Sequence, residues 1–221
     1  MLLCVDMAID LGMLRTVGSE LSAVAMAALS TPLRALLPRD GYDPRAAYPT
    51  PVILVHGFLG SPTNFVAIRS QLAAAGISNA FHFNYAARLD YRRFVVQLAA
   101  MSETLCRKTG VPQIDIVAHS LGGLIARGVI ESGTRVRRLV TLGSPSLGPE
   151  IAPQELAVYG AADPLIPLPD STCGPGGRVV IVPHCGHVGL LYEQVVLKTV
   201  TTYLAAAAKE FPIVAATRPA A

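Results

Sequence analysis

The sequence predicts an α/β fold with a minimal, doubly wound parallel sheet of about six strands and helices on both faces of the sheet. Short apolar runs alternate along the chain with segments of helical periodicity, which is the pattern of repeated βαβ units. The composition agrees, because 52% hydrophobic residues with 19 Gly and 17 Pro suit buried parallel strands joined by tight loops. A chain of 221 residues is long enough for one domain with a single large core.

Each element is predicted from its local pattern. Residues 65–75 form a helix because Phe65, Ile68 and Leu72 recur on one face. A longer helical segment, residues 91–108, leads the chain into the strand that follows it. The predicted strands are residues 52–55, 79–85, 114–117, 139–142, 156–160 and 179–182.

Residues 118–123 place Ser120 between small residues at the junction of a strand and a helix. A strand-to-helix turn this tight brings neighbouring backbones almost into contact, so only small residues fit at positions 118 and 122. The helix that follows directs its N-terminal N–H groups at the serine oxygen, where they favour negative charge. The pattern predicts that Ser120 is a nucleophile, although such a pattern alone often marks only a tight turn.

The loop after the first strand, residues 56–61, supplies a second part of the predicted site. Its two glycines, Gly57 and Gly60, allow the backbone to approach a reacting carbonyl group closely. We expect the backbone N–H groups of Phe58 and Leu121 to form an oxyanion hole.

An aspartate and a histidine follow the serine in the chain order of a Ser-Asp-His triad. Asp163 comes directly after the fifth predicted strand, and His187 lies in a glycine-flanked loop after the sixth. The order predicts that His187 is the general base and that Asp163 orients it. Asp170 remains an alternative acid in a loop rich in Pro and Gly, and His184 an alternative base close to the strand end.

Together these segments resemble the small, lidless bacterial lipases of the α/β-hydrolase superfamily, the class-2-like triacylglycerol lipases. The most specific parts are Ala118 in place of the usual glycine and the closing Gly-His-x-Gly-Leu-Leu segment, residues 186–191. The resemblance covers about residues 50–205. It implies an α/β-hydrolase fold and the hydrolysis of acylglycerols or other carboxylic esters, without a metal or an organic cofactor. The first fifty residues lie outside the resemblance.

Other functions on the same residues remain open. The triad also serves thioesterases and acyltransferases, because a fold does not determine a function. A non-catalytic binding protein is a further alternative, against which the complete triad argues. The net charge of +3, without a Lys/Arg cluster interleaved with aromatics, does not predict nucleic acid as a partner. We expect the basic group Arg135, Arg137 and Arg138 to be a solvated turn before the fourth strand.

The sequence predicts no lid or cap domain over the serine. The connection from Gly143 to Glu155 contains several prolines and is long enough to cross over, but too short to cover a cleft. Apolar residues on loops at the carboxyl ends of strands are the expected walls for an acyl group, with ordinary core as the alternative for each. They are Phe58, Leu59, Leu121, Leu165, Ile166, Val188 and Leu190.

Residues 1–37 form a separate N-terminal segment with an apolar helical stripe, which consists of Leu14, Val17, Leu21, Val24 and Ala28. Asp6, Asp10 and Glu20 interrupt any signal-peptide core, and the longest uncharged stretch is too short to span a bilayer. We expect a helix packed on the catalytic domain, with peripheral membrane contact or a cover over the cleft as alternatives. A Pro-rich linker (38–51), the catalytic domain (52–208) and a C-terminal tail (209–221) follow.

The four cysteines, Cys4, Cys106, Cys173 and Cys185, do not have metal-ligand spacing. Free thiols in a reducing compartment are the favoured prediction, and with them a cytoplasmic or membrane-peripheral location. The alternative is secretion, where a Cys173–Cys185 disulfide would brace the histidine loop.

Overall fold

The computed structural model describes residues 40–85, 91–146, 154–168 and 177–206, together with Gly18, Glu20, Leu21 and Ala25 of the N-terminal segment.

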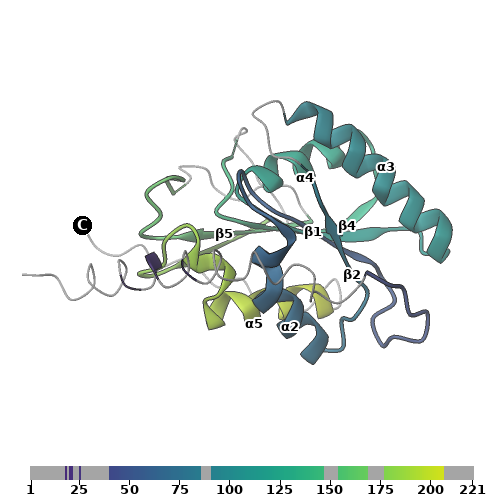
Figure 1. The fold of residues 1–221 in the computed structure, drawn as a ribbon, viewed down its shortest axis with the longest axis horizontal. Coiled ribbons are helices and arrows are strands. Elements are labelled where there is room, and N and C mark those ends of the chain that lie inside the picture. Colours follow the sequence, from purple (N-terminus) through teal and green to yellow (C-terminus); the bar gives the residue numbers. More distant parts are fainter. Residues whose placement is uncertain are drawn as a thin grey trace, which may run out of the picture.

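A six-stranded, entirely parallel sheet forms the centre of the molecule (Figure 1). The order of strands across the sheet is β2-β1-β3-β4-β5-β6. The direction of winding therefore reverses between β1 and β3, and ligands of such sheets bind beside this point, at the carboxyl ends of the strands. The strands are β1 (Val52–Val55), β2 (Ala80–Phe83), β3 (Ile114–His119), β4 (Val136–Leu142), β5 (Glu155–Gly160) and β6 (Arg178–Val182).

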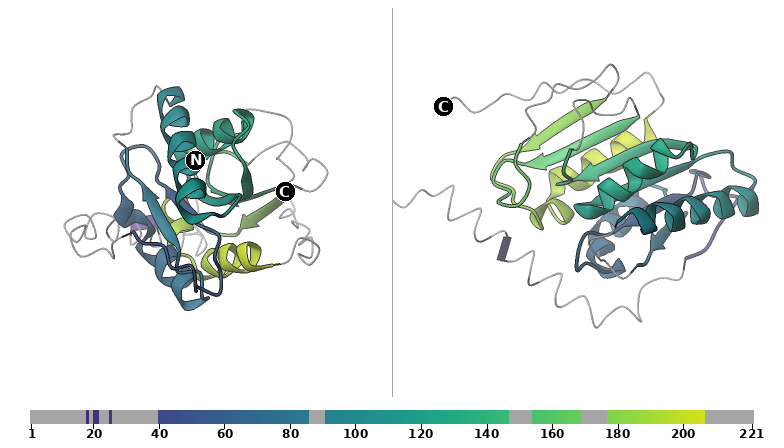
Figure 2. Two further views of the ribbon diagram at one scale, coloured as in Figure 1. Left: turned by 90° about the vertical axis from the view of Figure 1, so that its right-hand side faces the viewer. Right: turned by 90° about the horizontal axis from the view of Figure 1, so that it is seen from above.

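Helices cover both faces of the sheet, which confirms the predicted fold class. Figure 1 shows α3 (Arg92–Thr109) and α4 (Leu121–Glu131) above the sheet, with α2 (Val66–Ala74) and α5 (Gln194–Ala205) below it. The left-hand view of Figure 2 shows the same layers from the side. Two short 3-10 helices, η2 (Pro62–Phe65) and η3 (Gly189–Leu191), lie in the loops after β1 and β6.

The side chains of β1, which lies between β2 and β3, enter two hydrophobic cores on opposite faces of the sheet. Val52 and Leu54 belong to the core between the sheet and helices α2 and α5, whereas Ile53 and Val55 belong to the core between the sheet and helices α3 and α4. Successive side chains of a strand point to opposite faces, so a strand covered on both faces is apolar at every position. This explains the uninterrupted apolar run from which the strand was predicted.

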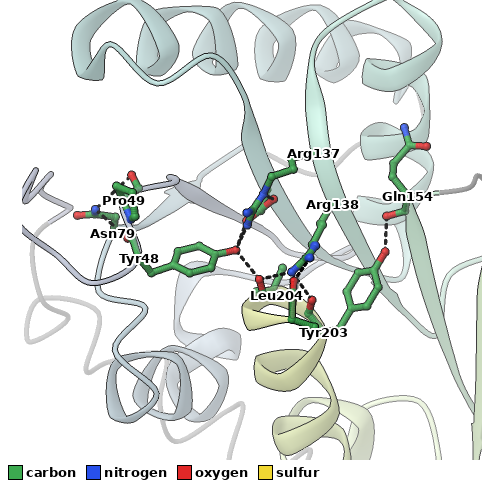
Figure 3. A network of polar contacts seen from close by, with 10 residues as sticks. Tyr48, Pro49, Asn79, Arg137, Arg138, Gln154, Tyr203 and Leu204 are labelled. Carbon is green, nitrogen blue, oxygen red and sulfur yellow. Dashed lines mark hydrogen bonds and ion pairs between the residues drawn. The ribbon is translucent and has the colours of Figure 1, made fainter. Parts of the chain in front are cut away.

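The prediction of a solvated basic turn before the fourth strand is wrong for two of its three arginines. β4 begins at Val136, so Arg137 and Arg138 lie inside the strand. The Arg137 guanidinium pairs with the fully buried carboxylate of Asp115 at 2.6 Å and also donates to the Tyr48 hydroxyl. Arg138 donates to carbonyl groups at the C-terminal end of α5 (Figure 3). The helix dipole also favours a cation at this end. Both side chains fasten neighbouring elements to the sheet.

The described part of the predicted linker also binds to the catalytic domain. Asp40 accepts a hydrogen bond from Arg69 at 2.9 Å and one from the backbone N–H of His82 on β2 at 2.9 Å. Burial acts to raise the pKa of Asp40, but the contacts with His82 and Arg69 outweigh it and lower the pKa to about 2. This end of the linker is therefore tied to the edge strand of the sheet.

The connection between β4 and β5 is as short as predicted, because β4 ends at Leu142 and β5 begins at Glu155. Glu155 is buried and forms an ion pair of 2.7 Å with Arg127 of α4. Within the described ranges, no helix has the length and apolar character needed to cross a membrane.

We predict that Gly160→Ala destabilises the protein. A Cβ atom at Gly160 would lie 2.2 Å from the carbonyl oxygen of Cys185, so the loop after β6 would have to move. Overpacking of this kind costs about 1 to 3 kcal/mol. In a protein of this size each kcal/mol lowers Tm by about 2 to 4 °C, which thermal unfolding followed by circular dichroism measures.

Gly41→Ala is the matched control, because no atom lies within 4 Å of the Cβ position at Gly41. Its Tm should equal that of the wild type. An unchanged Tm in Gly160→Ala would contradict the close approach of the β5 and β6 loops.

Candidate active site

Ser120 forms the turn between β3 and α4. Every residue of β3 is buried as far as His119, and α4 begins at Leu121, so a single residue turns the chain. Ser120 has φ 53° and ψ −124°, a conformation that residues other than glycine rarely adopt. Strain of this kind is typical of a nucleophile held at a strand-to-helix turn.

Close contacts between α4 and its neighbours explain the small residues around the serine. A Cβ atom at Gly122 would lie 2.4 Å from the carbonyl oxygen of Val55, and one at Gly123 would lie 2.2 Å from Ser144 Oγ. Ala118 is fully buried. A larger side chain at Gly122 would push α4 away from the end of β1, and one at Gly123 would push it away from Ser144 after β4. The need for a small residue at position 122 agrees with the sequence pattern.

The loop that carries Phe58 lies against this turn. Val55 of β1 is paired in register with Ala118 of β3, so the loops after the two strands leave the sheet side by side. A Cβ atom at Gly57 would lie 2.8 Å from Ser120 Cβ. Leu121 is the first residue of α4, and its N–H has no acceptor within the helix.

A buried histidine and a tyrosine hold this loop, and the sequence analysis did not assign a role to either. The ring of His56 stacks on Tyr85, with ring centroids 4.3 Å apart. The Tyr85 hydroxyl donates a hydrogen bond of 2.6 Å to the carbonyl oxygen of His56. Burial raises the pKa of Tyr85, so this hydroxyl keeps its proton and remains a donor.

His187 and Asp163 meet at the carboxyl end of the sheet. His187 Nδ1 lies 2.7 Å from Asp163 Oδ2, and both side chains are almost fully buried. The other carboxylate oxygen, Oδ1, accepts hydrogen bonds from the backbone N–H groups of Leu165 at 2.8 Å and Ile166 at 3.0 Å. Burial acts to raise the pKa of Asp163, but the hydrogen bond with His187 and those with the backbone of Ile166 and Leu165 outweigh it and lower the pKa below its ordinary value. The carboxylate is therefore charged at neutral pH.

His119, directly before Ser120, is a further residue to which the sequence analysis gave no role. Its Nε2 atom lies 3.1 Å from the carbonyl oxygen of His187, and the ring centroids of His119 and His187 are 4.7 Å apart. Burial and the neighbouring His187 lower the pKa of His119 to about 4. His119 is thus neutral at pH 7, with its proton on Nε2, because a carbonyl oxygen can only accept.

The residues predicted as acyl walls differ in exposure. The side chains of Phe58, Leu59 and Leu165 are 49%, 83% and 67% exposed. Leu121, Ile166 and Val188 are partly buried and pack against the hydrophobic core. Leu190 lies in η3, has no exposed surface and belongs to a hydrophobic core, which is the alternative that the sequence left open for it.

Several predictions concern residues beyond the described ranges. They include Asp170, Cys4, Cys173 and the stripe residues Leu14, Val17, Val24 and Ala28. His184, the alternative base, is exposed and has a positive φ of 54°. Cys185 is buried and has a free thiol, so the Cys173–Cys185 disulfide is not formed in this structure. In the part of the chain that the structure describes, no His, Cys, Asp and Glu side chains gather as a group that could hold a metal ion.

Comparisons with known proteins agree with this architecture. A family model described as palmitoyl protein thioesterase matches residues 51–201. Lipase B from Aspergillus fumigatus is 12% identical, with a TM-score of 0.62, and the match covers 75% of this chain and 54% of that one. A CIB-like hydrolase from Thermoplasma acidophilum is 16% identical, with a TM-score of 0.55, and the match covers 72% of this chain and 87% of the other.

The α/β hydrolase MGS-MChE2, from the metagenome of sediments of the Mar Chica lagoon in Morocco, is 16% identical. Its TM-score is 0.51, and the match covers 70% of this chain and 90% of that one. These similarities confirm the α/β-hydrolase fold. The narrower resemblance to lidless class-2-like lipases stays a prediction.

We predict that the protein loses stability as the pH falls from about 6.5 to about 4. The unfolded chain binds a proton at His119 near its ordinary pKa of 6.5, whereas the native state binds it only near pH 4. The stabilisation by neutral His119 is therefore complete above pH 6.5 and is lost as the pH falls, by up to about 3 kcal/mol. Urea unfolding at pH 7 and at pH 4.5 measures the loss.

His119→Gln retains a donor for the His187 carbonyl but cannot take up a proton, so the loss between the two pH values should shrink. His184→Gln removes an exposed histidine and serves as the control. An equal loss in His119→Gln and the wild type would contradict a buried neutral His119.

Proposed function

Because the chain belongs to the palmitoyl protein thioesterase family of α/β hydrolases, we propose that it is a serine hydrolase that cleaves acyl esters or thioesters. Ser120 is the nucleophile, His187 the general base and Asp163 the acid that orients His187. The observation that supports this most strongly is the 2.7 Å contact between His187 Nδ1 and Asp163 Oδ2, at the same edge of the sheet as the strained serine.

The proton positions follow from the hydrogen bond between the two side chains. A carboxylate only accepts, so the proton of neutral His187 lies on Nδ1 and its Nε2 atom carries the lone pair. Nε2 takes the proton of Ser120 as Oγ attacks the acyl carbonyl carbon. The N–H groups of Phe58 and Leu121 stabilise the oxyanion that forms.

Collapse of the tetrahedral intermediate breaks the bond to the leaving group, which receives the proton from His187 Nε2. Water then attacks the acyl group on Ser120 and gives a proton to His187, which returns it to Ser120 Oγ as the carboxylic acid leaves. Each proton in this scheme moves between Ser120, His187, water and the substrate.

Exposed apolar side chains near the proposed triad support an acyl substrate. Phe58 and Leu59 lie in the loop after β1, and Leu165 lies two residues after Asp163. Apolar surface of this kind favours binding of a hydrocarbon chain, because the chain leaves water on binding. The area buried between these side chains and the substrate increases with the length of the acyl chain.

A thioester is the second candidate for the scissile bond, favoured by the match to the thioesterase family. A thiol is a stronger acid than an alcohol, so its departure depends less on protonation by His187. Comparing kcat/KM for p-nitrophenyl esters from acetate to palmitate with acyl thioesters of the same lengths decides which bond is preferred.

We expect Ser120→Ala to lower kcat by at least about a thousandfold on whichever substrate the wild type prefers, because the triad acts as a unit. A fluorophosphonate should label the wild type and not this variant. Ser132→Ala changes an exposed serine just past the other end of α4 and should retain full activity. A folded Ser120→Ala protein with a tenth of the wild-type rate would disprove the assignment.

Asp163→Asn should lower ester hydrolysis by about a hundredfold or more, since the amide no longer holds the correct tautomer of His187. The loss on thioesters should be smaller, because the thiol leaves with less help from His187. Both losses are measured as kcat under saturating substrate. Asp170→Asn is the control, and a larger loss in that variant would identify Asp170 as the acid.

A further inference from the structure

A carboxylate from the N-terminal segment is hydrogen-bonded to the loop that carries His187. Glu20 Oε2 accepts from the backbone N–H of Val188 at 3.0 Å, and Oε1 accepts from that of Gly189 at 2.6 Å. Val188 directly precedes η3 and Gly189 is its first residue, and N–H groups at the start of a helix have no acceptor within it. Glu20 thus satisfies both donors with one side chain.

Two glycines of the histidine loop make room for this carboxylate. A Cβ atom at Gly186 would lie 2.3 Å from Glu20 Cδ, and one at Gly189 would lie 2.7 Å from Glu20 Oε1. The contact with Glu20 therefore explains why Gly186 and Gly189 have no side chain. They allow a side chain from far away in the sequence to reach the backbone beside His187.

The contact adds a third partner to the two that already hold His187. Asp163 holds the imidazole ring, and His119 holds the carbonyl oxygen of His187 at 3.1 Å. Glu20 holds the next two N–H groups, so the backbone of His187 is fastened both at its own carbonyl and immediately after it. The first two partners belong to the catalytic domain, whereas Glu20 precedes it in the sequence.

We propose that Glu20 is a positioning residue for His187, through which the N-terminal segment sets the alignment of the base with Ser120. This rests on the proposed function of the triad. A proton-transferring base must lie within hydrogen-bond reach of its partner, and small displacements lower the rate steeply. The N-terminal segment then contributes to turnover without touching the substrate.

The charge of Glu20 is part of the contact. A carboxylate accepts hydrogen bonds from N–H groups more strongly than a neutral amide does, and it offers two acceptor atoms. The charge of Glu20 also acts on the buried thiol of Cys185. Burial, followed by the charges of Glu20 and Glu193, raises the pKa of this thiol to about 12. Glutamine would present an NH₂ group to one of the two N–H donors, so it cannot replace Glu20.

The test uses the full-length protein with Glu20→Gln, Glu20→Ala and Glu20→Asp. Glu193→Gln is the matched control, because it removes an exposed carboxylate that also acts on Cys185. Steady-state hydrolysis of a soluble short-chain p-nitrophenyl ester gives kcat and KM. Hydrogen exchange of the amides of Val188 and Gly189, followed by mass spectrometry of peptides from this loop, reports the contact independently of activity.

We expect Glu20→Gln and Glu20→Ala to lower kcat about tenfold with KM changed less than about twofold, since the base and not the substrate is displaced. Their loop amides should exchange faster, whereas amides of β3 and α4 stay protected. Glu20→Asp should recover part of kcat because it keeps both acceptor oxygens. Glu193→Gln should match the wild type in both measurements.

Unchanged kcat in Glu20→Gln and Glu20→Ala would overturn the proposal, whether or not the amides exchange faster. Unchanged exchange would show that the contact itself is absent in solution. Labelling of the wild type at Ser120 by a fluorophosphonate separates these results from failure of the proposed function. A wild type that is neither labelled nor active would remove both proposals together.

Discussion

The close approach of α4 to the end of β1 is the constraint on which the rest of the site depends. The start of the helix lies so near the carbonyl oxygens of Val55 and His56 that a Cβ atom at Gly122 would collide with both. This contact forces the chain to turn within one residue and holds Ser120 at positive φ. It also brings the loop that carries Phe58 against the serine, because β1 and β3 are paired in register. A methyl group at position 122 would displace α4 and separate the turn at Ser120 from this loop.

The two ends of the sheet have different tasks. The amino ends of β3 and β4 carry charged groups that stabilise the fold, where Arg137 pairs with buried Asp115 and Arg138 binds the end of α5 (Figure 3). Removing Arg137 would leave the fully buried carboxylate of Asp115 without its cation, and an uncompensated buried charge costs up to about 3 to 5 kcal/mol. The carboxyl ends of β3, β5 and β6 lead into the loops with Ser120, Asp163 and His187. The contacts of Arg137 and Arg138, which stabilise the fold, thus lie at the opposite end of the sheet from the groups proposed to act on substrate.

Histidine side chains carry different parts of the proposed mechanism, and burial separates them. His119 is buried, its pKa is lowered to about 4, and it acts as a neutral donor to the backbone of His187. His187 is held by a charged carboxylate, which favours the tautomer needed for a base. His56 is buried under Tyr85 and supports the loop after β1. His187 combines a charged partner, Asp163, with a place on the loop after β6.

The sequence by itself determined the fold class and the order of Ser120, Asp163 and His187, because these depend on local patterns. A buried strand is apolar at each position, a tight turn needs small residues, and parallel strands place their following loops at one edge. Only the tertiary structure decided the burial of Leu190, the partners of Arg137 and Arg138, and the contact of Glu20 with the histidine loop. Each of these joins residues far apart in the chain, and such contacts depend on distances of a few ångströms that only the packed helices and strands define.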